Sequence, residues 1–190
     1  MMSTFVEVVS RTALKERVEQ LGAEISADLK GEVPVMVGVL HGSVVFLADL
    51  VRAMSIDLEV EFLSLTRFGH DGQIGIAMDI AEALEGRHVV LVEDIVDTGL
   101  TLASMRRLLE VRNPATIRTV TLLDKAPRRI VEVDLEYRGF EVGDEFLLGY
   151  GLDWKGHYRN VSSLWAVMDL EVLQADPLAF ARHLGISPEV

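Results

Sequence analysis

The stretch "VVLVEDIVDTGLTLASM", residues 89–105, decides the fold of this chain. It begins with a continuous apolar run, which is typical of a strand buried on both faces, and it ends with the apolar spacing of a helix. A glycine turn between a strand and a helix favours anion binding, because the first N–H groups of a helix have no partners inside it. The same turn nevertheless carries three carboxylates, Glu93, Asp94 and Asp97.

A ribose 5-phosphate ligand explains this combination. Glu93 and Asp94 are suitable acceptors for a vicinal ribose diol, and Asp97 lies between the diol and phosphate subsites. The alternative from the residues alone is that these acids only cap the helix. The loop is not of the Walker type, because the pattern G-x-x-x-x-G-K-[ST] is absent. Four residues at the helix start can hold a monophosphate through backbone N–H groups and two hydroxyls: Thr98, Gly99, Leu100 and Thr101.

Around this stretch, strands and helices alternate along the chain. Apolar residues with helical spacing occur at 14–29, 44–54 and 102–109. A short continuous apolar run predicts a strand buried on both faces at 33–40, and residues 57–65, 87–93 and 116–124 also predict strands. This alternation indicates an α/β fold in which helices cover both faces of a parallel sheet. Residues 66–79 are polar and glycine-bearing, and they predict a long, mobile functional loop.

The pattern changes after Lys125. Residues 129–137, 145–151 and 163–169 suggest short strands without long helices between them, and residues 177–185 suggest a short terminal helix. We expect this part to form a smaller cap at the edge of the sheet.

The composition favours small-molecule partners. The 190 residues include 30 acids against 18 Lys and Arg, a net charge of −12, and the only paired arginines are at 106–107 and 128–129. We therefore expect neither nucleic acid nor membrane as a partner. The absence of cysteine excludes disulfides and thiolate catalysis, and it fits a reducing compartment. Since we find no signal peptide or membrane-spanning run, we expect a cytoplasmic protein.

Three blocks of sequence resemble a known family. "VVLVEDIVDTGLTL" resembles the phosphoribosyl-pyrophosphate signature of type I phosphoribosyltransferases. "LLDKAPRR" and "DEFLLGYGLDWKGHYRN" resemble the purine hood of hypoxanthine/guanine phosphoribosyltransferases. Together with "GVLHGSVVFLADLVRAM", the likeness covers most of residues 35–168. It implies a single domain over 1–190, with a parallel-sheet core flanked by helices at about 10–125. A small β-rich hood would occupy about 126–170 together with N-terminal residues.

The resemblance also implies a reaction. It is the transfer of ribose 5-phosphate from phosphoribosyl pyrophosphate to a 6-oxopurine, hypoxanthine or guanine, in purine salvage. The products would be IMP or GMP and pyrophosphate, with Mg²⁺ as cofactor and a homodimer or homotetramer as the assembly. Glu93 and Asp94 would hold the ribose hydroxyls, residues 98–101 would hold the 5-phosphate, and Asp97 would assist proton transfer at purine N7.

The remaining roles implied by the resemblance concern the purine and the pyrophosphate. Lys125 would contact purine O6, Phe146 would stack on the base, and backbone groups near Leu147 would read the ring edge. Asp153 would help Glu93 and Asp94 to bind Mg²⁺, and Arg159 would reach the pyrophosphate. From the residues alone, Lys125 could be an exposed lysine at a strand end, Phe146 a core residue, and Asp153 with Arg159 a surface ion pair.

Some positions depart from the family pattern. His41 stands where relatives commonly carry Lys, in the turn "LHGS" whose backbone amides, with Gly42, would contact pyrophosphate. This turn often holds a non-proline cis peptide in the family. Arg67 and Phe68 take the places of a Ser-Tyr pair in the mobile loop, and Leu100 replaces a polar residue. These departures leave open the hypothesis of a catalytically weak binding protein, and a ligand-sensing regulator that kept the binding core is a second alternative.

Overall fold

The computed structural model describes residues 3–68 and 73–186. Within it the chain forms two compact units, which we call the sheet unit (residues 15–144) and the hood unit (residues 1–14 and 145–190). Helix α1 (Arg11–Asp28) crosses the division. The other elements up to residue 144 are β2 (Val35–Val39), α2 (Val44–Ala53), β3 (Glu59–Phe68), β4 (Gln73–Met78), β5 (His88–Val96), α3 (Leu100–Glu110), β6 (Thr116–Asp124), the 3-10 helix η1 (Ala126–Arg128) and β7 (Tyr137–Glu141).

The sheet unit contains a six-stranded sheet in the order β4-β3-β2-β5-β6-β7. Every neighbouring pair is parallel except β3 and β4, which are antiparallel. All five residues of β2 are buried, as the apolar run predicted. This confirms the predicted α/β fold with a mostly parallel sheet.

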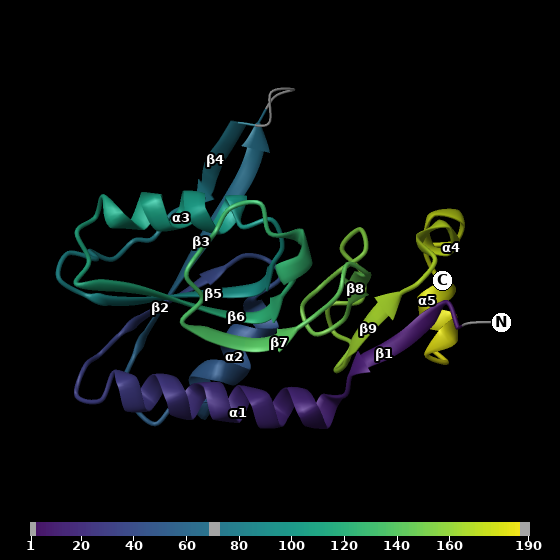
Figure 1. The fold of residues 1–190 in the computed structure, drawn as a ribbon, viewed down its shortest axis with the longest axis horizontal. Coiled ribbons are helices and arrows are strands. Elements are labelled where there is room, and N and C mark those ends of the chain that lie inside the picture. The colour runs from purple at the N-terminus through teal and green to yellow at the C-terminus, as the bar shows by residue number, and fades with distance from the viewer. Residues whose placement is uncertain (1–2, 69–72, 187–190) are drawn as a thin grey trace. The chain divides into compact units, whose positions relative to one another are not determined.

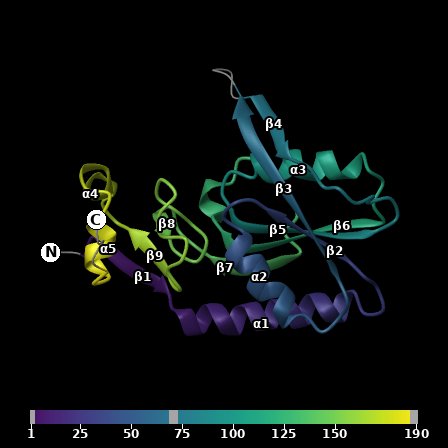
Figure 2. The ribbon, with the colours of Figure 1, turned by 180° about the vertical axis from the view of Figure 1, so that it is seen from behind.

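Helices cover the two faces of this sheet. Figures 1 and 2 show α3 on one face and α1 with α2 on the other. Leu102, Met105 and Leu109 of α3 are buried in the cluster formed by the side chains of that face. On the opposite face, α1 and α2 approach closely, since a Cβ on Gly22 would lie 2.9 Å from the backbone of Ala53. The helical spacing at 14–29 therefore marks a buried helix face, as expected.

The predicted long loop over 66–79 is wrong for most of its length. Strand β3 continues to Phe68, and β4 pairs with it in antiparallel register, Arg67 opposite Ile74 and Phe68 opposite Gln73. Ladder hydrogen bonds between adjacent strands outweigh the low strand propensity of this glycine-bearing segment. The side chains of Arg67 and Phe68, like residues 69–72, lie outside the described part of the chain.

The segment after Lys125 also differs from the expectation. Residues 129–136 form no strand, whereas β7 begins at Tyr137 and pairs in parallel with β6. The sheet unit therefore continues to residue 144 instead of ending near 125. The Arg17 guanidinium of α1 donates to the carbonyls of Arg138 (2.6 Å from Nη2) and Gly139 (3.4 Å from Nε) on β7, the last strand of the sheet.

The hood unit has its own sheet and core. Its antiparallel sheet has the order β1-β9-β8. Phe5, Leu148, Val167, Leu173 and Phe180 are buried together in its core. The strands near 146 and 164 and the terminal helix were predicted, but β1 and α4 were not. The hood elements are β1 (Phe5–Val9), β8 (Phe146–Leu148), β9 (Leu164–Val167), α4 (Leu170–Ala175) and α5 (Ala179–His183).

Among the residues that the structure describes, no helix has both the length and the apolar character needed to cross a membrane.

Candidate active site

Three neighbouring strands bring the predicted residues of the sheet unit to one edge. Strands β2, β5 and β6 are adjacent and parallel, so their carboxyl ends meet at the same edge of the sheet. His41 and Gly42 follow β2, Asp97 follows β5, and Lys125 follows β6. The turn after β2 contacts strand β5, since a Cβ on Gly42 would lie 1.5 Å from Oδ2 of Asp94. Any side chain larger than glycine at position 42 would therefore displace the Asp94 carboxylate.

The turn after β2 has an unusual backbone. The Leu40–His41 peptide bond is cis, which is the non-proline cis peptide that the family resemblance implied. The turn is anchored by Leu40 N–H, which donates to Leu63 O at 2.9 Å, and by Ser43 Oγ, which donates to Val39 O at 2.6 Å. The His41 side chain is exposed. This arrangement leaves an imidazole at the edge where a pyrophosphate was predicted to bind.

Glu93 and Asp94 differ in environment although they are adjacent. Glu93 is only 6% exposed, and burial, followed by the charge of Asp94, raises the pKa of its carboxyl well above the ordinary value. Asp94 is half-buried, and its Oδ1 accepts a hydrogen bond from Ile95 N–H at 2.9 Å. Both influences on Glu93 disfavour its charged form, so a ligand that offers hydroxyl donors or positive charge would relieve this cost.

The turn between β5 and α3 requires glycine. Gly99 is the N-cap residue of α3 with a φ of 84°, and a Cβ there would lie 2.4 Å from Val131 O. Since glycine occupies the cap position, the alternative that the carboxylates serve only as caps is not supported. Thr98 O accepts from the N–H groups of Ile130 and Val131, both at 3.0 Å. The Leu100 side chain is 51% exposed, which is why a leucine is tolerated at a position that would act through its backbone.

Asp97 is paired with an arginine that the sequence did not single out. Arg128 Nε lies 2.8 Å from Asp97 Oδ1, although the N–H lacks the alignment of a hydrogen bond. Arg129 Nη1 donates to the Asp97 carbonyl at 2.8 Å, and Arg129 also pairs with the buried Asp124. The available signal was the arginine pair at 128–129, three residues after Lys125. In the sequence it indicated only a short basic run.

Lys125 is buried, which excludes the alternative of an exposed lysine at a strand end. Its exposed fraction is 7%. Its backbone N–H donates to Val96 O at 2.9 Å, and its Nζ donates to Asp144 O at 3.4 Å. A buried ammonium is costly unless acceptors surround it, so this side chain is suited to contact an acceptor atom of a ligand.

The hood unit contains the other predicted residues. The Phe146 ring packs edge-to-face on Trp154 with centroids 5.5 Å apart, and Leu147 is buried in β8. Phe146 therefore has the packing role named as its alternative, and it remains partly exposed. Asp153 Oδ1 pairs with Arg159 Nη2 at 2.8 Å, while Asp153 Oδ2 accepts from Gly156 N–H at 2.6 Å. The predicted metal ligand and the predicted pyrophosphate ligand thus hold each other in one turn.

No cluster of three or more His, Asp or Glu side chains that could hold a metal ion occurs in residues 3–68 and 73–186. Mg²⁺ is commonly bound by one or two carboxylates together with water and substrate phosphates. Glu93 and Asp94 are two such carboxylates on adjacent positions of β5.

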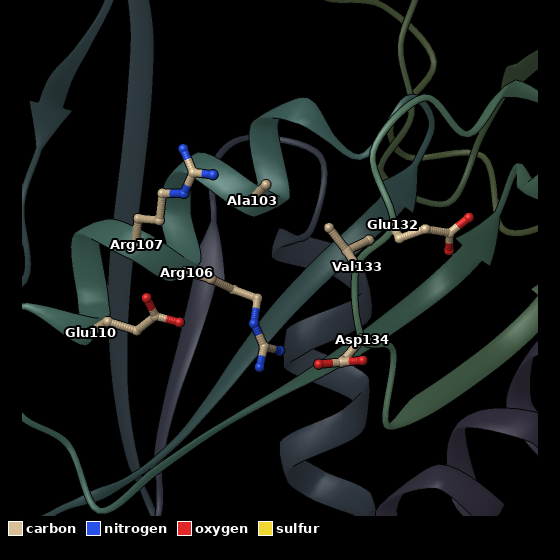
Figure 3. Close-up of a pocket in the computed structure, with 7 residues that line it drawn as sticks. All are labelled: Ala103, Arg106, Arg107, Glu110, Glu132, Val133 and Asp134. Carbon is tan, nitrogen blue, oxygen red and sulfur yellow. The ribbon is translucent and has the colours of Figure 1, made fainter.

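A pocket beside α3 is separate from these residues (Figure 3). It lies between α3 and residues 132–134, and none of the predicted site residues lines it. Arg106, which extends across it, donates to Thr119 Oγ1 at 2.8 Å and to Ile117 O at 3.3 Å. We therefore assign Arg106 a structural role.

A glycine turn at a helix start, with carboxylates beside it at the carboxyl edge of a parallel sheet, defines an α/β protein of the class that binds nucleotides or sugar phosphates. Residues 7–155 match the family described as "Phosphoribosyl transferase domain", and the chain belongs to this family.

Named relatives share much of its sequence. The chain is 39% identical over 158 residues to the hypoxanthine-guanine phosphoribosyltransferase of Streptococcus pneumoniae, covering 81% of this chain and 88% of the relative. It is 39% identical over 170 residues to the hypoxanthine phosphoribosyltransferase of Haemophilus influenzae, covering 85% and 94%. A crystal structure of a hypoxanthine-guanine phosphoribosyltransferase from Bacillus anthracis, with HEPES in its active site, superimposes with a TM-score of 0.83 at 37% identity and covers 86% of this chain and 98% of that chain.

Proposed function

We propose that this chain transfers ribose 5-phosphate from phosphoribosyl pyrophosphate to hypoxanthine or guanine and releases pyrophosphate. The observation that carries the proposal is the meeting of three loops at one sheet edge: the Gly42 turn, the β5–α3 turn and the buried Lys125. The relatives named for this activity support it, since they match more than four fifths of the chain.

The sheet edge would bind the sugar phosphate. Backbone N–H groups at the start of α3, with the hydroxyls of Thr98 and Thr101, would hold the 5-phosphate, because these N–H groups have no acceptors inside the helix. Glu93 and Asp94 would accept hydrogen bonds from the ribose diol. Such donors stabilise the charged form of Glu93, which burial otherwise disfavours. The turn at His41 and Gly42 would present backbone N–H groups to the pyrophosphate.

Asp97 would accept the proton that the purine loses. When N9 bonds to the anomeric carbon, the bond to pyrophosphate breaks, and the neutral base must give up one proton. A carboxylate near N7 can take it, and such assistance contributes about 10²- to 10⁴-fold to the rate. Asp97 lies in the chain between the proposed diol carboxylates and the start of α3, and it would lie beside the reacting ring.

Lys125 would select 6-oxopurines. An ammonium donates to the O6 of hypoxanthine or guanine, whereas the 6-amino group of adenine offers only donors there. From the hood unit, Phe146 would stack on the base, the backbone near Leu147 would read its edge, and Arg159 would reach the pyrophosphate.

Glu93, Asp94 and Asp153 would contribute to the binding of Mg²⁺, which neutralises charge on the departing pyrophosphate when bound. Arg67 and Phe68, at the end of β3, would close over the substrates. The expected cytoplasmic location and the homodimer or homotetramer stay predictions. The comparisons do not favour the alternative of a regulator or a weak binding protein.

The direct test measures formation of IMP from hypoxanthine and phosphoribosyl pyrophosphate with Mg²⁺, and repeats it with guanine and adenine. We expect turnover of the two 6-oxopurines and none of adenine. Efficient use of adenine would contradict the role of Lys125, and absence of turnover with every base would favour a binding protein. Asp97→Asn should retain phosphoribosyl pyrophosphate binding, measured by calorimetry, and lose about a hundredfold or more in kcat.

A further inference from the structure

Arg128 bridges two carboxylates from different parts of the sheet unit. Its Nε lies 2.8 Å from Oδ1 of Asp97, and its Nη1 donates to Oδ1 of Asp144 at 2.7 Å. The three side chains are 44–70% exposed, so the pairs contribute little to stability, because water and salt screen exposed ion pairs. The bridge therefore needs an explanation other than stability.

The geometry of Asp97 suggests one. Oδ1, the oxygen facing Arg128, is buried, although the whole side chain is 44% exposed. Oδ2 is therefore the oxygen that a ligand can reach. A carboxylate with one oxygen held against a guanidinium keeps its other oxygen in a fixed direction, and proton transfer depends strongly on such alignment.

Asp144 links this arrangement to the lysine. Its carboxylate holds Arg128, and its backbone carbonyl accepts from Lys125 Nζ at 3.4 Å. The side-chain hydrogen bond and charge of Arg128 lower the pKa of the Asp144 carboxyl, which keeps it ionised as a partner. Asp144 thus contacts both Lys125, which is expected to donate to purine O6, and Arg128, which pairs with the proposed proton acceptor Asp97.

We propose that Arg128 is a positioning residue that orients Asp97 toward purine N7, and that Asp144 anchors Arg128. The proposal rests on the proposed role of Asp97 as proton acceptor. Arg128 acts through Asp97 alone, so its removal should affect the chemical step and leave the binding of phosphoribosyl pyrophosphate unchanged.

The test is a double-mutant cycle on kcat. Arg128→Gln should lower kcat by about tenfold, a part of the acid–base contribution, with the KM for phosphoribosyl pyrophosphate changed by less than about twofold. Arg128→Lys, which restores the charge, should recover about half of the loss on a logarithmic scale, since lysine lacks the planar fork that reaches two carboxylates. In an Asp97→Asn background, Arg128→Gln should cause no further loss. Arg107→Gln, an exposed arginine on α3, is the matched control and should retain wild-type kinetics.

The outcomes separate this inference from the function on which it rests. If Asp97→Asn retains full kcat, Asp97 is not the proton acceptor, and its role and the positioning role of Arg128 both fail, while the transfer activity itself stands. If Asp97→Asn is impaired but Arg128→Gln keeps wild-type kcat, or loses the same factor in both backgrounds, only the positioning role is overturned. Circular dichroism and thermal melts of each variant exclude misfolding as the cause.

Discussion

The sheet unit and the hood unit hold their charged residues in different ways. At the sheet edge, Glu93 and Lys125 are 6% and 7% exposed, and both causes that act on Glu93 raise the pKa of its carboxyl. In the hood, Asp153 and Arg159 are 29% and 31% exposed and pair with each other. The sheet edge therefore carries an electrostatic cost that a ligand can relieve, whereas the hood pair is already satisfied.

The sheet unit and the hood unit also differ in the backbone conformation around these residues. The sheet edge obtains its shape from buried strands and needs a left-handed glycine at one point of the β5–α3 turn, Gly99. The hood turn places Tyr150, Lys155 and Tyr158 at positive φ in addition to three glycines. Positive φ is uncommon for such residues. We infer that strand β5 positions Glu93 and Asp94, while the hood groups depend on a turn that its own hydrogen bonds maintain.

The largest expected effect tests how rigid the sheet edge is. In Gly42→Ala, the new Cβ would overlap Asp94 Oδ2, so either the carboxylate or the turn must move. Because misplacement by about 1 Å can cost about a hundredfold in rate, we expect kcat/KM to fall by about that factor. The control is Gly86→Ala, which has a φ of 69° and open space around the Cβ, and which should lower Tm without loss of activity. An active Gly42→Ala enzyme would show that the edge adapts.

The next effect concerns the buried lysine. Lys125→Ala removes a charged donor, and hydrogen bonds to charged groups are worth about 1.5–3 kcal/mol, so the KM for hypoxanthine should rise about 10- to 100-fold. The KM for phosphoribosyl pyrophosphate should change much less. Lys30→Ala, at an exposed lysine, is the matched control. Equal increases in the KM of both substrates would indicate collapse of the edge instead of loss of a base contact.

A smaller effect is expected in the hood. Asp153→Ala leaves Gly156 N–H and Arg159 without their carboxylate, which should destabilise the turn by about 1–2 kcal/mol and lower Tm by about 2–8 °C. Asp153→Asn keeps an acceptor for Gly156 and should melt closer to wild type. If both variants melt like wild type, the turn does not depend on this carboxylate, and the contrast with the sheet edge is wrong.

The smallest effect is a change in stability with pH. The pKa of Glu93 is raised in the folded state, so its contribution to stability is greatest below the unfolded value of about 4.3 and is lost as pH rises through the folded value. Glu93→Gln removes this loss. At pH 8 we expect the ligand-free variant to have a higher Tm than wild type, and the difference to vanish near pH 4. A Tm difference between the variant and wild type that does not change with pH would contradict the raised pKa of the Glu93 carboxyl.

The sequence predicted those elements whose local pattern of apolar residues is typical of only one kind of secondary structure. Strand β2 and the first half of β5 are continuous apolar runs, and α3 has a clear buried stripe. Strand β4 could not be predicted, because its pairing with β3 depends on a partner that local propensity does not report. For the site, the signature near Asp97 located the sheet-edge residues. The bridge from Arg128 to Asp97 and Asp144 joins residues up to 47 positions apart. The spacing of apolar residues along the chain does not report such long-range contacts between charged side chains.

The contact of Arg17 with β7 has a consequence for association between molecules. Strand β7 ends the sheet opposite β4, and an unpaired strand edge is a template on which another chain can add a strand. The Arg17 guanidinium occupies the Arg138 and Gly139 carbonyls and places a positive charge there. A second molecule would have to displace it before pairing along β7. We infer that this contact of α1 hinders the addition of a further strand along β7.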